Sequence, residues 1–147
     1  MTTSLKAQVG QGLDEITPAR ATVERLLAAA RRQIADAKTR GVSAETRFTA
    51  AYTAIRMLAD ASLNANGYRT QSSRTGHHYT AIQNLTLTTG LPVGTVRLLQ
   101  AFRRQRNDTE YSGETVPEST VQACVAQAEA LLAHVTGWLA HAKPKLT

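Results

Sequence analysis

The residues best suited to chemistry lie in one polar run late in the chain, FRRQRNDTEYSG at 102–113. No proline interrupts the run, and its single glycine comes last, so an apolar helix upstream is expected to continue through it. The buried side of that helix then passes into Arg103, Arg106, Asn107 and Tyr111. Arginines that lean toward an interior need a carboxylate or a phosphate as partner. The run is therefore a candidate phosphate-binding site.

A purely structural interpretation of the same run is also open. Arg106 and Glu110 are four residues apart and can form an ion pair on a solvated helix end, which is a common arrangement. Arg103, Asn107 and Tyr111 recur at the same interval, so their side chains are expected to be neighbours under either interpretation.

Two histidines are the next candidates. His77 and His78 follow Gly76 at the start of a predicted helix, and from there they could fold over Arg106. The alternative is that one histidine packs or caps the helix while the other is solvated. Adjacent residues of a helix point about 100° apart, and no further Cys or His lies at ligand spacing. We therefore expect neither a metal site nor a cofactor.

Composition narrows the class of protein. The chain has 147 residues, enough for one domain, and a net charge of +6 that comes mostly from arginine. This balance is compatible with an RNA or nucleotide partner, although codon usage in a GC-rich genome would produce it equally well.

The single cysteine, Cys124, excludes an internal disulfide framework. No apolar stretch is long enough to span a membrane and no secretory signal is present, so we expect a cytoplasmic protein without a membrane partner.

Hydrophobic periodicity predicts an all-α fold that positions these residues, an up-and-down bundle of four to five helices. Residues 1–15 show no sustained period and are expected to be frayed or disordered, so that 16–147 form a single domain. No segment alternates like a strand. The predicted helices run from Thr17–Pro18 to Gly41, from Ser43 to 64–68, over 77–87, from Pro92 or Val93 to about Tyr111, and from Pro117 to about Ala142.

The segment RRQRNDTEYSGETVPESTVQACVAQAEALL, residues 103–132, resembles the C-terminal half of a HEPN domain (higher eukaryotes and prokaryotes nucleotide-binding). The signature of that family is an arginine, a polar residue directly after it, and a histidine that is separated from the arginine by four to six residues. Here Arg106 is followed by Asn107, and Tyr111 occupies the histidine position. The upstream segment GYRTQSSRTGHHYTAIQNL, 67–85, is similar to small bacterial members, and the helix order matches over roughly 43–142.

The resemblance implies a HEPN-like helical bundle that forms a homodimer, with the motifs of both protomers lining one cleft. Catalytic members are metal-independent endoribonucleases in which the 2′-OH of RNA attacks the adjacent phosphate. Many small members are toxins of toxin–antitoxin pairs, encoded beside a nucleotidyltransferase-type antitoxin. Carried onto this sequence, Arg106, Asn107 and Tyr111 are the expected catalytic residues. Tyrosine titrates near pH 10, so Tyr111 is suited to hydrogen-bond a phosphate oxygen and is a poor base at neutral pH.

Three functions remain open on the sequence alone. The first is a HEPN-type endoribonuclease with the catalytic residues just named and with Arg103, His77 and His78 binding phosphate or RNA. The second, favoured by tyrosine in place of histidine, is a non-catalytic HEPN domain that binds nucleotide, RNA or a partner nucleotidyltransferase. The third is a helical adaptor in which Arg106 and Glu110 form an ion pair and nothing more.

Overall fold

A computed structural model describes residues 4–147 of the chain, and the fold is mostly helical, as the sequence predicted. Short segments precede and interrupt the helices: a 3-10 turn η1 (Lys6–Gln8) and the strands β1 (Leu13–Glu15) and β2 (Tyr68–Thr70). None of the described helices combines the length and the apolar character needed to cross a bilayer. The helices are α1 (Arg20–Ala37), α2 (Ala44–Ala65), α3 (His77–Gln83), α4 (Leu85–Thr89), α5 (Val93–Ser112) and α6 (Glu118–Ala142).

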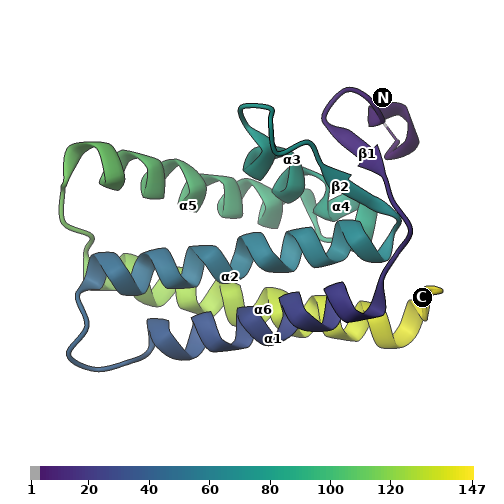
Figure 1. The fold of residues 1–147 in the computed structure, drawn as a ribbon. Coiled ribbons are helices and arrows are strands. Elements are labelled where there is room, and N and C mark those ends of the chain that lie inside the picture. Colours follow the sequence, from purple (N-terminus) through teal and green to yellow (C-terminus); the bar gives the residue numbers. More distant parts are fainter. Residues whose placement is uncertain (1–3) are drawn as a thin grey trace.

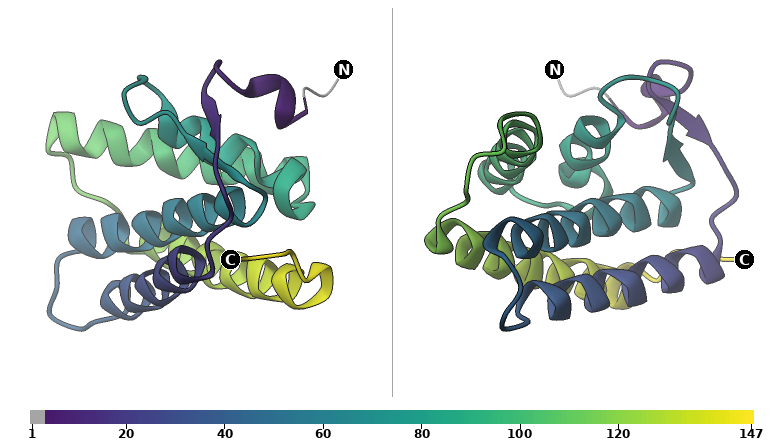
Figure 2. Two further views of the ribbon diagram at one scale, coloured as in Figure 1. Left: turned by 45° about the vertical axis from the view of Figure 1, so that its right-hand side comes forward. Right: turned by 60° about the vertical axis from the view of Figure 1, so that its left-hand side comes forward.

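The four long helices alternate in direction along the chain, and α2 lies at the centre (Figure 1). Helices α1 and α6 pack against α2, while α5 lies on the side of α2 opposite α1 (Figure 2). The short helices α3 and α4 connect α2 to α5 and contact both. Because α2 is surrounded in this way, a polar side chain on it has few routes to solvent.

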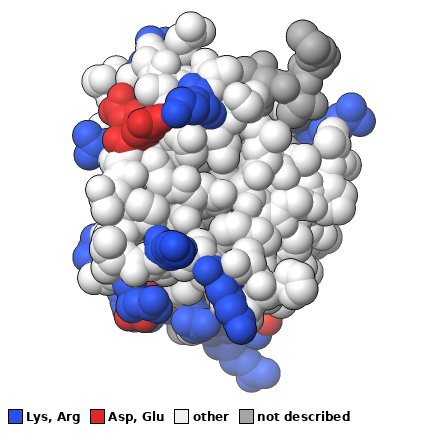
Figure 3. All heavy atoms as spheres, turned by 90° about the vertical axis from the view of Figure 1, so that its right-hand side faces the viewer, with Lys and Arg blue, Asp and Glu red and all other residues white. Residues whose placement is uncertain are grey.

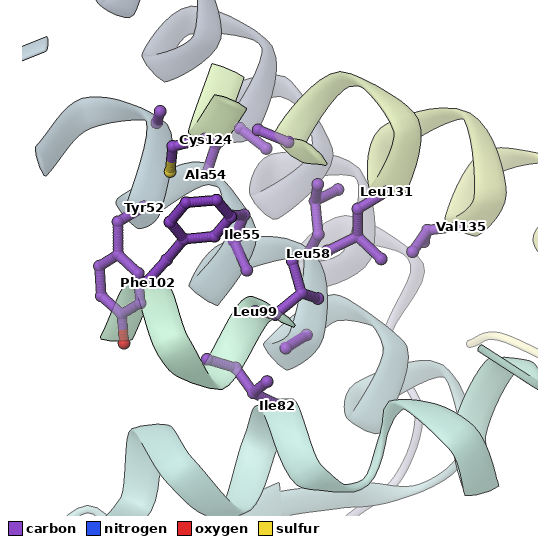
Figure 4. Packing of buried hydrophobic residues seen from close by; sticks show 14 of the residues in the cluster. Tyr52, Ala54, Ile55, Leu58, Ile82, Leu99, Phe102, Cys124, Leu131 and Val135 are labelled. Carbon is purple, nitrogen blue, oxygen red and sulfur yellow. The ribbon is translucent and has the colours of Figure 1, made fainter. Parts of the chain in front are cut away.

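The hydrophobic core is built around α2 (Figure 4). Phe48 of α2 meets Phe102 of α5 edge to face, with ring centroids 6.3 Å apart. Alanines such as Ala51 and Ala54 are fully buried on α2, and their small side chains allow neighbouring helices to approach closely. At the start of α2, the Ser43 hydroxyl accepts a 3.2 Å hydrogen bond from the backbone N–H of Thr46 and caps the helix, which begins where the sequence predicted.

The helix predicted over 77–87 is two short helices that divide at Asn84. The Asn84 side-chain amide donates to the carbonyl of Thr80 at 3.0 Å and to the side-chain oxygen of Gln8 at 2.9 Å. Asparagine competes with helical backbone bonding in this way, which explains the break. Gly90 ends α4 at a positive φ of 73°, a conformation that glycine adopts without strain.

The structure differs from our expectation of a frayed segment over 1–15, and from the expectation that no strand forms. Within the described residues of this segment, β1 pairs antiparallel with β2, Leu13 facing Thr70, and the Leu13 side chain is fully buried. Three-residue strands are too short to show a period, and their pairing partner lies far along the chain, so nothing local signals them. Residues 1–3 lie outside the described residues.

Candidate functional site

Helices α2, α3 and α5 bring a group of charged and aromatic side chains together on the side of α2 that faces α5. Contacts and electrostatic influence connect its members to one another. We call this group the arginine–histidine cluster. It consists of Tyr52, Arg56 and Asp60 from α2, His77 and His78 from α3, and Arg103 and Arg106 from α5.

Arg106 lies over the ring of Tyr52, with its guanidinium carbon 5.7 Å from the ring centre. One of its terminal nitrogens, Nη2, forms a 2.9 Å ion pair with Oε1 of Glu110, and the side chain is 25% exposed. Its Nε is buried and has no hydrogen-bond partner within the described chain. The ion pair expected from the spacing is therefore present, and it leaves donor groups of Arg106 unused.

Arg103 is held in place by a buried amide. Its Nε donates to Oε1 of Gln100 at 2.8 Å, and Gln100 in turn donates to the backbone carbonyl of Tyr79 at 3.0 Å. The guanidinium carbon of Arg103 lies 5.3 Å from the centre of the Tyr79 ring. These contacts tie α5 to α3 and fix the orientation of the arginine before any ligand arrives, which lowers the entropy lost on binding.

Asp60 is the acidic member of the cluster and lies one helical turn after Arg56. Oδ2 of Asp60 is 3.7 Å from Nη1 of Arg56. Burial raises the pKa of the Asp60 carboxyl to about 6, although Arg56 and His77 oppose the shift. The carboxyl therefore loses or gains its proton at a pH close to 6, about one unit below neutral.

The two histidines stack edge to face with ring centres 4.2 Å apart. His77 places Nδ1 3.2 Å from the carbonyl oxygen of Arg74 in the preceding loop. Burial, together with the positive charges of Arg56, His77, Arg106 and Arg103, lowers the pKa of His78 to about 4. His78 is thus neutral at pH 7 and able to accept a proton.

Tyr52 lies beneath the arginines and is 1% exposed. Its hydroxyl is buried without a hydrogen-bond partner among the described residues, and it points away from Cys124 in the apolar core (Figure 4). Burial raises the pKa of this phenol, while Arg106, Arg103 and Arg56 act in the opposite direction. The phenol therefore remains protonated at neutral pH.

The structure does not bring every predicted site residue into the cluster. Arg103, Arg106, His77 and His78 lie within it. Asn107 is half-buried on α5 and makes no side-chain hydrogen bond to another described residue. Tyr111, in the last turn of α5, is 94% exposed. A role for Tyr111 beside Arg106 therefore depends on a second protomer and stays a prediction.

Sequence reasoning missed the contribution of α2. None of Tyr52, Arg56 and Asp60 stands out from the sequence pattern used above. The three residues recur at i, i+4 and i+8, so they form one polar stripe on a helix that is otherwise largely buried. That stripe is the signal that would have found them.

The grouping of arginines in the cluster is a stronger indication of an anion site than the positive net charge of the whole chain. On the end of the molecule that carries β1 and β2, lysines and arginines are scattered around a broad uncharged area (Figure 3). Residues 4–147 contain no group of three or more His, Cys, Asp or Glu side chains that could hold a metal ion.

Comparison with protein-family models, with curated proteins and with solved structures found no match.

Proposed function

We propose that this chain is a HEPN-like protein that grips a phosphate of RNA at the arginine–histidine cluster, and that it cleaves RNA there without a metal ion. The observation that carries the proposal is that three arginines, Arg56 from α2 and Arg103 and Arg106 from α5, lie close enough to His78 of α3 for their charges to lower its pKa, so that this histidine is neutral. The mostly helical fold and the motif around Arg106 and Asn107 support the same assignment.

The arginines supply the phosphate-binding half of the chemistry. Arg103 and Arg106 present fixed guanidinium groups that match the geometry of phosphate oxygens, and the Tyr52 ring lies beneath Arg106. A bound phosphate would compete with Glu110 for Nη2 of Arg106. As negative charge builds on the phosphoryl oxygens in the transition state, preorganised donors of this kind stabilise it, each worth about 10²–10³ in rate.

Proton transfer is assigned to the histidines. His78 accepts the proton of the ribose 2′-OH as O2′ attacks the adjacent phosphorus. The bond from phosphorus to O5′ then breaks, and His77, in ring contact with His78, donates a proton to O5′. The products are a 2′,3′-cyclic phosphate and a 5′-hydroxyl end. A bound anion offsets the positive charges around His78 and raises the pKa of that histidine toward the value a base needs.

Non-catalytic binding is the second candidate function. It is favoured by the tyrosine at position 111, which stands where the resembled family has histidine and which is exposed in the single chain. In that case the same cluster binds RNA, a nucleotide or a partner nucleotidyltransferase, and no bond is broken.

The two candidates are separated by an assay with a matched control. Purified protein is incubated with total tRNA in EDTA, and the products are tested for 2′,3′-cyclic phosphate ends. Arg106→Gln is expected to lower the cleavage rate about 100- to 1,000-fold. Arg104→Gln removes the same charge from the exposed side of the same helix and is expected to leave the rate close to that of the wild type.

The outcome of this assay decides between the catalytic and the non-catalytic candidate functions. Binding of RNA that weakens in Arg106→Gln, with no cleavage by the wild type, supports the non-catalytic candidate. Equal effects of Arg106→Gln and Arg104→Gln indicate that overall charge alone attracts RNA, and the assigned site is then wrong. Light scattering of the purified protein in solution tests the expected homodimer.

A further inference from the structure

A neutral cavity of about 500 Å³ opens beside the arginine–histidine cluster, between η1, α3, α4 and the start of α5. Its size falls within the range of small-molecule sites. Its lining combines one aromatic ring, several side-chain amides and hydroxyls, and the aliphatic side chains of Leu87, Val93 and Val96. No Lys, Arg, His, Asp or Glu is among its lining residues in the described chain.

Two lining residues connect the cavity directly to the phosphate-binding arginines. The Tyr79 ring lies 5.3 Å from the guanidinium carbon of Arg103. The side-chain oxygen of Gln83 accepts a 3.3 Å hydrogen bond from Gln100, the same residue that accepts from Arg103. A ligand that extends from Arg103 into the cavity would have an anionic part at Arg103 and a neutral part in the cavity.

The groups that line the cavity fit a flat heteroaromatic ring. Tyr79 is 45% exposed although it is large and aromatic, and Arg103 restrains its ring. The amides of Gln8 and Asn84 bond to each other reciprocally at 2.8 and 2.9 Å, which makes one wall polar and rigid. The side-chain nitrogen of Gln83 donates to no other group among residues 4–147, so it is free to bond the edge of a ring.

Two other cavities lack this combination. A cavity of about 450 Å³ between α1, α2 and the end of α5 is lined by Asp36, Glu45, Glu110 and Glu114, which repel a phosphate-bearing ligand. A cavity at the loop 71–74 is basic, through Arg69 and Arg74, but no aromatic or aliphatic side chain lines it.

We infer that the cavity beside Tyr79 is a nucleobase subsite, and that the ligand of the cluster is therefore single-stranded RNA. This inference rests on the proposed function, because it places a base on Tyr79 while a neighbouring phosphate lies at Arg103 and Arg106. Duplex RNA does not fit, since its bases are paired and stacked inside the helix. Base stacking on an aromatic side chain tolerates any base, so the subsite selects an unpaired strand and not a sequence.

The test measures the affinity of 2′-O-methyl RNA, which has no 2′-OH and is not cleaved. A short single-stranded oligonucleotide is compared with the same backbone carrying abasic positions, by fluorescence anisotropy at one fixed salt concentration. Tyr79→Leu is expected to weaken binding of the normal strand about 5- to 150-fold, the effect of losing one stacked base. Tyr79→Phe keeps the ring and is expected to bind like the wild type.

The abasic strand separates stacking from an indirect effect through Arg103. If Tyr79 stacks a base, the wild type binds the abasic strand weakly, and Tyr79→Leu weakens that binding no further. Equal loss on the normal and abasic strands would mean that Tyr79 acts only by holding Arg103, and the subsite would be refuted. Duplex RNA bound as tightly as the single strand by the wild type would refute it as well.

Failure of this inference is distinguishable from failure of the proposed function. Binding that weakens in Arg106→Gln but not in Tyr79→Leu overturns the base subsite and leaves the phosphate site intact. A wild-type chain that binds none of the oligonucleotides overturns both. Circular dichroism of each variant checks that the fold is retained.

Discussion

The carboxyl of Asp60 makes the chain less stable at neutral pH than it would be with a neutral side chain there. Two effects compete at this position: burial disfavours the carboxylate, while Arg56 at 3.7 Å and His77 favour it. Burial prevails, so the pKa of the folded carboxyl rises from 3.8 to about 6. Replacement by the neutral isostere in Asp60→Asn is therefore expected to stabilise the fold at pH 7.

The sign and size of this change in unfolding free energy follow from linkage between protonation and folding. Between about pH 4 and pH 6 the folded state binds the proton more tightly than the unfolded state, so the contribution of this carboxyl to stability falls as pH rises through that window. A shift from 3.8 to about 6 corresponds to about 3 kcal/mol at about 1.4 kcal/mol per unit. The side chain is 30% exposed, and solvent screening reduces this to about 1–2 kcal/mol.

Urea denaturation of the wild type and Asp60→Asn at several pH values between about 4 and 7.5 measures the effect. The difference in unfolding free energy, variant minus wild type, is expected to rise by about 1–2 kcal/mol from the acidic to the neutral end. Asp108→Asn serves as the control, because Asp108 is exposed on α5 and its replacement is expected to change stability by less than about 0.5 kcal/mol throughout.

A difference that stays constant with pH would refute the reasoning, since the carboxyl would then have the same pKa in both states. A difference that falls as pH rises would show that the attraction of Arg56 outweighs burial. Either result would also remove Asp60 from consideration as a group that titrates near neutral pH.

Three further predictions concern other residues. Leu13→Ala is expected to destabilise the fold by about 2–5 kcal/mol in urea denaturation, because it empties a fully buried site; a change below about 0.5 kcal/mol would restore the expectation of a frayed segment. Glu110→Gln is expected to tighten RNA binding about two- to fivefold in titrations, since the competing carboxylate on Arg106 is removed; weaker binding would contradict this. The pKa of His78 is lowered from 6.5 to about 4, so wild-type stability falls as pH drops through that window; His78→Gln is expected to abolish about 1–2 kcal/mol of this loss in acid titration followed by circular dichroism.

The long helices were predictable because their signals are local. Three- and four-residue spacing of apolar residues marked α1, α2, α5 and α6, and Ser43 marked the start of α2. The pairing of β1 with β2 was not predictable, since neither three-residue strand carries a period and each depends on the other. The division at Asn84 depends on a hydrogen bond to Gln8, which no local pattern reveals.

The candidate site was predictable in part for a similar reason. Arg103 and Arg106 stood out because they interrupt an apolar face, and His77 and His78 because they open a helix. Their neighbours on α2 did not stand out, because proximity between helices depends on how the helices pack. Tyr111 has the right spacing but lies in the last turn of α5, where no other element covers it, so it remains exposed.

The central position of α2 affects how mutational data on this protein should be interpreted. One helix supplies both the middle of the core and the polar stripe at Tyr52 and Asp60, so a saturation screen scored by growth would mark nearly all of it as intolerant. Measuring cellular abundance in parallel would separate the loss of folded protein from the loss of activity. Substitutions at Ala54 would deplete the protein, whereas Arg56→Gln, under the proposed function, would lower activity by more than it lowers abundance.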